Sequence, residues 1–391
     1  MDAMIKDDGL TDDMLQGFAK RVALYDRENR FFQEDFDVLR KAGYLTLNVP
    51  KELGGRGYRL DQIARLQRRL AYHAPATALG INMHVYWVGV AADLWRAGDK
   101  SLEWMLREAI AGEVFAAGHS ERGNDLPLLL STAKAEKVAG GFKFTGHKMF
   151  GSLAPVWTRY GMHGLWADAE GGPRIVHGFL PRDAKGYKIV ETWDTLGMRA
   201  TRSDDVVLDG AVVPDKYIAR ILPAGGVDMF VLAVFAWALL GFGNIYYGMS
   251  QRAAELAAAA VKSKKAMAVT RTMAYHPEVQ HAMAQLMLAL DPVGPHLDQV
   301  ARDWSEGVEH GATWPSKIVS AKHHAVEACW KIVDIAMELS GGAGMFRGNE
   351  LERLFRDARC GRFHPANPAL VHEIVAKTAL GIDLGEQPRW G

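Results

Sequence analysis

The amino-acid sequence predicts an α+β protein that is mainly α, in which a β-rich middle segment separates two helical segments. Three observations predict this class. Helical periodicity runs through residues 11–110, short alternating runs occupy residues 112–220, and long Ala- and Leu-rich blocks follow from residue 224. We therefore expect three domains, over residues 1–111, 112–222 and 223–391.

The first segment contains several expected helices. Residues 33–42 place apolar side chains on one face, and Gly43 follows them as a typical helix C-cap. Residues 60–73 and 101–111 show the same helical period. The glycine-punctuated residues 49–57 predict a loop.

The middle segment carries the strand signals. Two alternating runs, residues 132–138 and 142–145, flank Gly140 and Gly141, and this pattern predicts a β-hairpin. Further strand candidates are residues 174–180 and 205–209.

The last segment returns to helices, over residues 230–261, 278–304 and 317–340. Prolines and a glycine within residues 291–295 are expected to kink or split the helix that contains them.

Composition and charge exclude several function classes. Of the 391 residues, 46 are Lys or Arg and 46 are Asp or Glu, so no net positive field favours nucleic acid or an anionic membrane. The longest apolar run, residues 229–243, is too short to span a bilayer and predicts a buried helix. Two cysteines and no signal-peptide pattern favour a cytoplasmic protein, and no spacing suggests a metal site.

Four segments could carry chemistry. They are the loop of residues 118–125, Phe150-Gly151-Ser152 after a strand, the polar residues 193–203, and the glycine-rich residues 341–344 between two helices. Glycines before a helix allow close approach of a phosphate, and a hydroxyl beside an aromatic ring can face a flat ring system. Taken alone, the glycine-rich segment is more typical of a helix cap, Phe150-Gly151-Ser152 of a turn and the loop 118–125 of a solvated connection, while residues 193–203 fit a surface hairpin equally well.

Together, these segments resemble the acyl-CoA dehydrogenase superfamily, in the same order and at similar spacing. Residues 352–359 match the pattern E-x-L-x-R-D-A-K/R, residues 196–201 match L-G-x-R-x-S/T, and residues 341–344 match G-G-x-G. Residues 146–152 are similar to the segment N-G-x-K-x-W-I-T that lies over the flavin, and residues 120–125 match the loop T-E-P-G-x-G-S-D in part.

The resemblance implies a helical N-terminal domain, a β-barrel-like middle domain and a C-terminal four-helix bundle. It implies FAD, with FMN as the alternative, between the middle and C-terminal domains. Contacts to the flavin are implied for Ser120, Phe150, Gly151 and Ser152, and contacts to its phosphates for Gly341, Gly342 and Gly344. Because the glycine loop of this family typically reaches a neighbouring subunit, a homodimer or homotetramer is expected.

The chain also departs from the family. Pro365 stands where the catalytic glutamate is expected, and Val231 stands near the alternative position of that base. The R-x-x-F-G segment that helps to bind FAD is missing, and Arg271 is the candidate substitute. Acyl-CoA dehydrogenation needs a base within reach of the substrate α-proton, so the usual reaction is in doubt.

Three hypotheses follow. The leading one is a flavin oxidoreductase that oxygenates a CoA thioester or an aromatic substrate with reduced flavin and O₂, with His364 and Ser152 beside the flavin. The second is an acyl-CoA dehydrogenase whose base has moved, with Glu121 as the candidate. The third is a non-catalytic protein that binds flavin or CoA and serves in assembly. A flavin reductase or an electron-transfer flavoprotein is the expected redox partner.

Overall fold

The computed structural model describes residues 9–267 and 269–386, in which two helical parts enclose a β-sheet part in chain order. The α-helices are α1 Asp12–Glu28, α2 Gln33–Lys41, α3 Leu60–His73, α4 Pro75–Arg96, α5 Glu103–Ile110, α6 Met229–Ser263, α7 Pro277–Leu290, α8 Val293–Glu306, α9 Trp314–Ser340, α10 Glu350–Cys360 and α11 Pro368–Leu380. The strands are β1 Phe115–Gly118, β2 Lys134–Val138, β3 Gly141–Gly151, β4 Arg159–Trp166, β5 Arg174–Pro181, β6 Tyr187–Val190, β7 Asp204–Pro214 and β8 Ile218–Pro223. The predicted fold class is confirmed.

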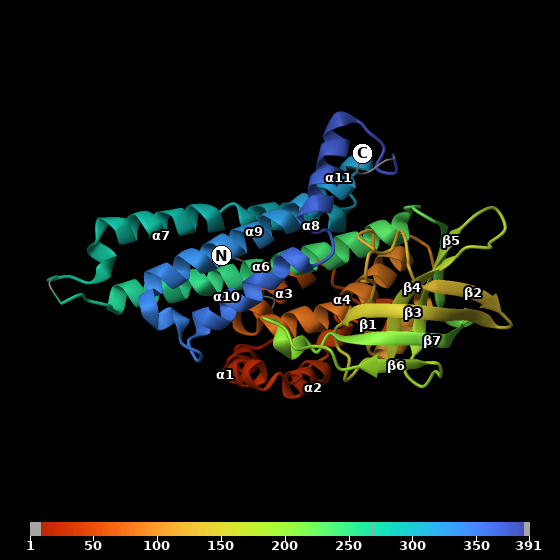
Figure 1. The fold of residues 1–391 in the computed structure, drawn as a ribbon, viewed down its shortest axis with the longest axis horizontal. Helices are drawn as coiled ribbons and strands as arrows, with labels where there is room; N and C mark the ends of the chain where they lie inside the picture. The colour runs from red at the N-terminus through yellow and green to blue at the C-terminus, as the bar shows by residue number, and fades with distance from the viewer. Residues whose placement is uncertain (1–8, 268, 387–391) are drawn as a thin grey trace.

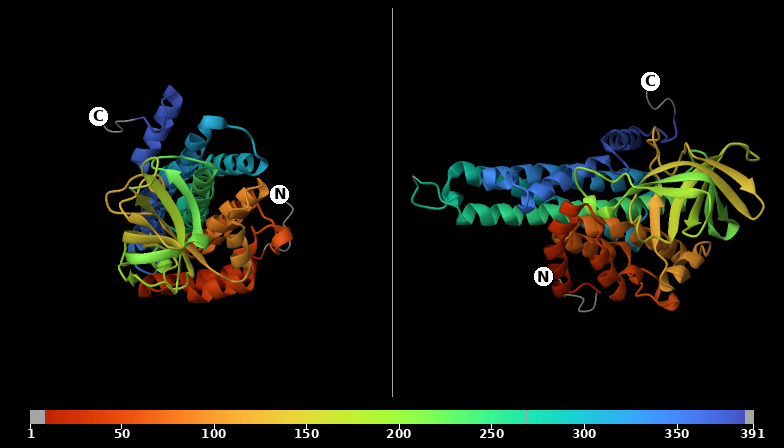
Figure 2. Two further views of the ribbon diagram at one scale, coloured as in Figure 1. Left: turned by 90° about the vertical axis from the view of Figure 1, so that its right-hand side faces the viewer. Right: turned by 60° about the horizontal axis from the view of Figure 1, so that its bottom comes forward.

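The molecule is elongated, with a bundle of long helices at one end and the sheet at the other (Figure 1). Helices α6 and α9 run side by side along the bundle, and α7 and α8 pack against α9. The N-terminal helices, red to orange in Figure 2, lie along one side of this bundle. Because α4 packs against both α6 and β1, it joins the bundle to the sheet.

The eight strands form one sheet in the order β6-β7-β3-β2-β4-β5-β8, and β1 pairs with β4 in parallel. The predicted hairpin is confirmed, since β2 and β3 pair antiparallel with Val138 opposite Gly141. Gly140 lies at the turn with a φ of 75°, a conformation that glycine adopts without strain. Toward its end, β3 shifts register against β7 between Lys148 and Gly151, at the edge that faces the bundle.

Helix α6 confirms the buried helix expected from its apolar run, although the helix is longer than that run. It is 35 residues long and, by length and composition alone, apolar enough to cross a membrane. However, 78% of its most apolar window is buried inside the protein, as in the core helix of a globular fold. Its side chains instead form the common wall of the bundle and the N-terminal helices, against α3, α4 and α9.

The predicted break at residues 291–295 is confirmed, because α7 ends at Leu290 and α8 begins at Val293. Helix α4 was not resolved as a separate element by the sequence pattern. It is buried almost all round, from Pro75 to Ala92, so it lacks the one-sided apolar stripe that marks a surface helix.

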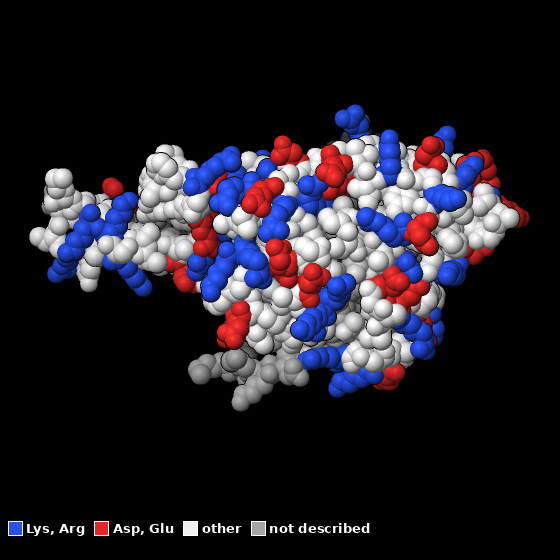
Figure 3. Space-filling model, turned by 90° about the horizontal axis from the view of Figure 1, so that it is seen from below, with Lys and Arg blue, Asp and Glu red and all other residues white. Residues whose placement is uncertain are grey.

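Basic and acidic side chains are interspersed over most of the face seen in Figure 3. This mixture agrees with the equal numbers of acidic and basic residues in the chain.

Candidate functional site

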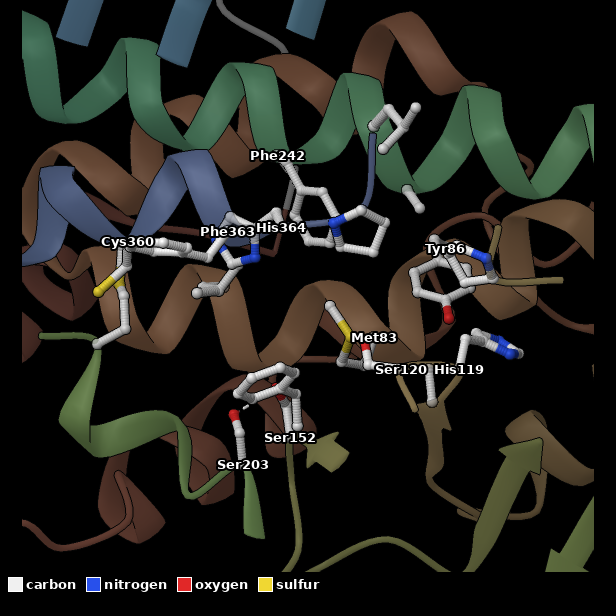
Figure 4. A pocket seen from close by; sticks show the side chains of 18 of the residues that line it. Met83, Tyr86, His119, Ser120, Ser152, Ser203, Phe242, Cys360, Phe363 and His364 are labelled. Carbon is white, nitrogen blue, oxygen red and sulfur yellow. Dashed lines mark hydrogen bonds between the residues drawn. The ribbon is translucent and has the colours of Figure 1, made fainter. Parts of the chain in front are cut away.

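A cavity of about 490 Å³ lies where α4, α6, the ends of β1 and β3, and the turn after α10 meet (Figure 4). Most of its lining side chains are apolar or aromatic, and they include Met83, Leu128, Phe235 and Phe242. The described lining contains no Lys, Arg, Asp or Glu. Its polar groups come from Tyr86, His119, Ser120, Ser152, Thr195, Ser203, Cys360 and His364. A large apolar cavity with a few convergent polar groups is the usual form of a small-molecule site.

Ser152 reaches this cavity from the end of β3. The turn that carries it is strained, because Phe150 has a φ of 59° and yet is not glycine. Gly151 leaves no room for a larger residue, since an added Cβ would lie 2.9 Å from both the Asp204 carbonyl and the Tyr160 hydroxyl. The Ser152 hydroxyl is buried and lies 2.7 Å from the Ser203 hydroxyl.

Phe150 lies at the rim of the cavity and is 46% exposed. Its ring meets Trp193 edge to face at 5.9 Å between centroids. A strained, exposed aromatic ring beside a buried hydroxyl suits a flat, partly apolar ring ligand, because such a ligand covers the ring and hydrogen-bonds to the hydroxyl. These residues therefore fit the flavin that the resemblance implies.

His364 enters the cavity from the turn that follows α10. Its imidazole stacks on Phe242 at 4.7 Å between centroids with 15° between the planes. Its Nε2 lies 2.8 Å from the Tyr246 hydroxyl. Burial, reinforced by the nearby positive charge of Lys322, lowers the pKa of His364 to about 3. The side chain is therefore neutral at physiological pH, with Tyr246 holding one of its two nitrogens.

Lys322 of α9 is hydrogen-bonded to the segment that carries His364. Its Nζ donates to the Ala366 carbonyl at 3.1 Å, and burial lowers the pKa of Lys322 to about 8. Pro365, at the position of the family's glutamate, lines the cavity and has no group to titrate. Val231, near the alternative position, is buried and is not among the described lining residues.

Glu121 lies outside the described lining of the cavity and is held by several groups. It forms a buried ion pair with Lys148, and it accepts hydrogen bonds from the Ser131 hydroxyl at 2.7 Å and the Thr132 amide at 2.8 Å. Burial alone raises its pKa, but the Lys148 charge and these hydrogen bonds outweigh it and lower the pKa overall. The geometry gives no support to Glu121 as a base at the cavity, and its contacts are those of a structural ion pair.

Of the remaining predicted residues, Ser120 lies at the cavity, whereas Arg271 and the glycine-rich loop lie at the far end of the helical bundle. Ser120 lines the cavity, and its carbonyl accepts the Met149 amide at 2.9 Å. Arg271 lies in the α6–α7 connection, at the end of the bundle away from the sheet, with its guanidinium over the Tyr275 ring. The loop that begins at Gly341 lies at this same end, because Lys264, which follows α6, donates to the Ser340 carbonyl at 3.2 Å. The loop and Arg271 are not among the described lining residues.

Sequence reasoning missed Tyr86, Ser203, Tyr246 and Lys322. Tyr86 and Tyr246 lie on helices without a polar face, so no pattern marked them. Ser203 closes the polar segment 193–203, two residues after the L-G-x-R-x-S/T match, so its neighbourhood was indicated, although its contact with Ser152 was not.

Comparison with known proteins finds relatives of this chain in sequence and in fold. Residues 230–377 match the family model "Acyl-CoA dehydrogenase, C-terminal domain". YdbM of Bacillus subtilis (strain 168), which carries a provisional acyl-CoA dehydrogenase name, is 27% identical over 92% of this chain and 93% of its own length. The amino sugar nitrososynthase DnmZ of Streptomyces peucetius is 29% identical over 91% of this chain and 88% of its own.

Among solved structures, KijD3 in complex with FMN and dTDP-3-amino-2,3,6-trideoxy-4-keto-3-methyl-D-glucose superposes with a TM-score of 0.85. It is 25% identical in sequence, and the match covers 97% of this chain and 96% of that one. The chain therefore has an acyl-CoA dehydrogenase-like fold, and residues 230–377 match the C-terminal domain of that family.

Proposed function

We propose that the protein is a flavin-dependent monooxygenase that uses reduced flavin and O₂ to oxygenate a small molecule in the cavity. One observation carries this proposal. The described lining of the cavity contains His364 and Ser152 but no carboxylate, so α,β-dehydrogenation lacks the base that it needs. The similarity to DnmZ and KijD3 supports the same class of reaction.

Phe150, Ser152 and Ser120 are the residues that would hold the flavin ring, which is FMN or FAD. The FMN in the KijD3 complex supports FMN, and the glycine loop supports FAD. The bound flavin would supply the activation of O₂. This chain supplies a cavity of fitting shape, apolar walls and the hydrogen-bonding groups of the site. The mostly apolar walls would keep water away from the activated oxygen, which would otherwise be lost as hydrogen peroxide.

His364 would provide a neutral hydrogen-bonding group at the place of oxygenation. A histidine with a pKa of about 3 does not carry a charge at pH 7, so it neither needs a carboxylate partner nor repels a cationic product. The stacking on Phe242 and the contact with Tyr246 hold the ring in one orientation. Such preorganised contacts lower the barrier of the chemical step.

The cavity fits a substrate whose reacting part is uncharged. An ionised group placed among these apolar walls would lose its hydration without gaining an opposite charge. An amine would therefore react as the free base, the form in which its nitrogen lone pair is available. Tyr86 offers the hydrogen bond that orients such a group, because its hydroxyl lines the cavity and has no partner among the described residues.

We further propose a homodimer or homotetramer in the cytoplasm, supplied with reduced flavin by a flavin reductase. The loop at Gly341, Gly342 and Gly344 and the side chain of Arg271 lie at the bundle end away from the sheet, so they would reach the flavin of another copy. The two cysteines, Cys329 and Cys360, are both free, which is consistent with a reducing compartment.

The function is tested by supplying the purified protein with FMN, a flavin reductase, NADH and ¹⁸O₂ in the presence of a panel of amines, phenols and thioesters. The proposal expects one ¹⁸O atom in a product and no product without O₂. A dehydrogenated acyl-CoA formed without O₂ would overturn it in favour of a dehydrogenase. Failure to bind flavin at all would instead support the non-catalytic alternative.

A further inference from the structure

Three hydroxyl groups form a row that leads from the cavity into the protein. Ser152 lies 2.7 Å from Ser203, and Ser203 lies 2.7 Å from Thr201, all measured between the hydroxyl oxygens. The Thr201 hydroxyl in turn lies 2.9 Å from the carbonyl oxygen of Met198. All three side chains are buried, but Ser152 and Ser203 also line the cavity.

The inner end of this row fixes the direction of every hydrogen bond in it. Two oxygens 2.9 Å apart need a hydrogen between them, and the Met198 carbonyl has none, so Thr201 must donate. A hydroxyl has one hydrogen, so Thr201 can only accept from Ser203. Ser203 has then used its own hydrogen and can only accept from Ser152.

The hydroxyl of Ser152 therefore donates its hydrogen to Ser203, and only its lone pairs face the cavity. A group bound there must donate a hydrogen to Ser152 in order to pair with it. If the bound group instead presents an acceptor, its lone pairs face those of Ser152 and the two groups repel. The only other outcome is that the hydrogen bonds within the row break, which destabilises these buried hydroxyl groups.

With a flavin ring held over Ser152, as the proposed function has it, the atom at which the two redox states differ in hydrogen bonding is the central ring nitrogen N5. The central ring nitrogen N5 of an oxidised flavin is an acceptor, whereas in the two-electron reduced flavin N5 carries a hydrogen and donates. We infer that Thr201 and Ser203 are positioning residues that make Ser152 an acceptor and so select the reduced flavin over the oxidised one. This inference rests on the proposed function, and it deepens it, because an oxygenase of this kind must capture reduced flavin and release the oxidised form.

The experiment compares Thr201→Val, which keeps the shape but removes the hydroxyl, with Thr201→Ser, which keeps the hydroxyl. The dissociation constants of FMN and of anaerobically reduced FMN are measured for wild type and both variants. The ratio of the two constants in wild type should favour reduced FMN. In Thr201→Val that preference should fall by about 3- to 10-fold, the worth of one hydrogen bond, because Ser203 is then free to donate and Ser152 can turn its hydrogen outward. Thr201→Ser should restore the wild-type ratio.

Ser203→Ala provides a second break in the row and should change the ratio in the same direction as Thr201→Val. A merely structural effect would weaken both redox states equally and leave the ratio unchanged. Equal ratios in wild type, Thr201→Val and Ser203→Ala would overturn the inference while leaving the monooxygenase proposal intact. Absence of binding by both redox states in wild type would overturn the proposed function itself.

Discussion

The Nε2 of His364 lies 2.8 Å from the hydroxyl of Tyr246, which ties the turn after α10 to the middle of α6. Phe242, one helical turn before Tyr246, stacks on the same imidazole. A proline occupies the family's glutamate position beside them, so the only titratable groups that this turn and α10 bring to the described lining are His364 and Cys360. Burial raises the pKa of Cys360 to about 12, which leaves its thiol protonated and a poor base.

Replacing His364 with alanine should abolish most oxygenation. General acid–base and hydrogen-bonding contributions of one side chain are worth on the order of 10²–10⁴-fold in rate. Product formation and hydrogen peroxide release are measured together, and peroxide is expected to replace product while FMN still binds. The matched variant Tyr246→Phe keeps the imidazole and loses only its partner, so its loss should be below about 10-fold. Equal turnover in wild type and His364→Ala would contradict the role of His364.

Lys322 should make the stability of the protein depend on pH in the alkaline range. Its pKa falls from 10.5 to about 8 on folding, because burial disfavours the charge. Between these two pH values the unfolded chain binds more protons, so this group contributes increasing stability as the pH rises. The free energy of unfolding of wild type minus that of Lys322→Met should therefore grow from pH 8 to pH 10.5, by about 3 kcal/mol at most.

Chemical denaturation at a series of pH values measures this difference. Subtracting the variant removes the contribution of Lys148, whose pKa is also lowered to about 8 by burial. A difference that stays flat or shrinks over this range would show that folding does not lower the pKa of Lys322.

The division into helical, β-rich and helical segments could be predicted because local periodicity and turn residues determine it. The hairpin at Gly140 and the break before Val293 were predicted for the same reason. The site was predictable only in part. His364 and Ser152 were identified from their place beside family motifs, but their partners Tyr246 and Ser203 lie 118 and 51 residues away in sequence. Such contacts are set by packing between elements, and no local pattern reports them.

For Glu121, a contact with a residue distant in sequence removes a predicted role. In sequence it is a carboxylate in a polar loop, which suits a relocated base. In the structure the loop lies against β3, and Lys148 reaches Glu121 through the interior. The residue that neutralises it is 27 positions away, so its availability as a base could not be judged from the loop alone.

Glu121→Gln should destabilise the fold. Removing one partner of a buried ion pair leaves the other charge uncompensated, which costs about 3–5 kcal/mol. Thermal and chemical denaturation should show this loss, whereas Glu136→Gln, which breaks an exposed pair with Lys143, should cost less than about 1 kcal/mol. Turnover per folded molecule should stay within about 10-fold of wild type in both variants; a loss of 10²-fold or more in Glu121→Gln alone would restore the relocated-base hypothesis.

Tyr86→Phe should weaken ligands that hydrogen-bond in the cavity and leave apolar ligands unaffected. Calorimetric titration with phenol and with toluene separates the two effects, and phenol binding is expected to fall by about 3- to 10-fold. Tyr160→Phe is the matched control, because the Tyr160 hydroxyl is also buried without a partner among the described residues but does not line the cavity. Unchanged phenol binding in Tyr86→Phe would remove Tyr86 from the substrate site.

The most direct test of the central claim is to mix the oxidised, flavin-loaded protein anaerobically with a panel of acyl-CoA thioesters and amines and to follow the flavin absorbance. A site without a base cannot transfer electrons from an acyl-CoA to the flavin, so the account predicts that the flavin remains oxidised with every compound. It also predicts that the same panel yields an ¹⁸O-labelled product once reduced flavin and ¹⁸O₂ are supplied. Bleaching of the flavin by any acyl-CoA in the absence of oxygen would contradict the account.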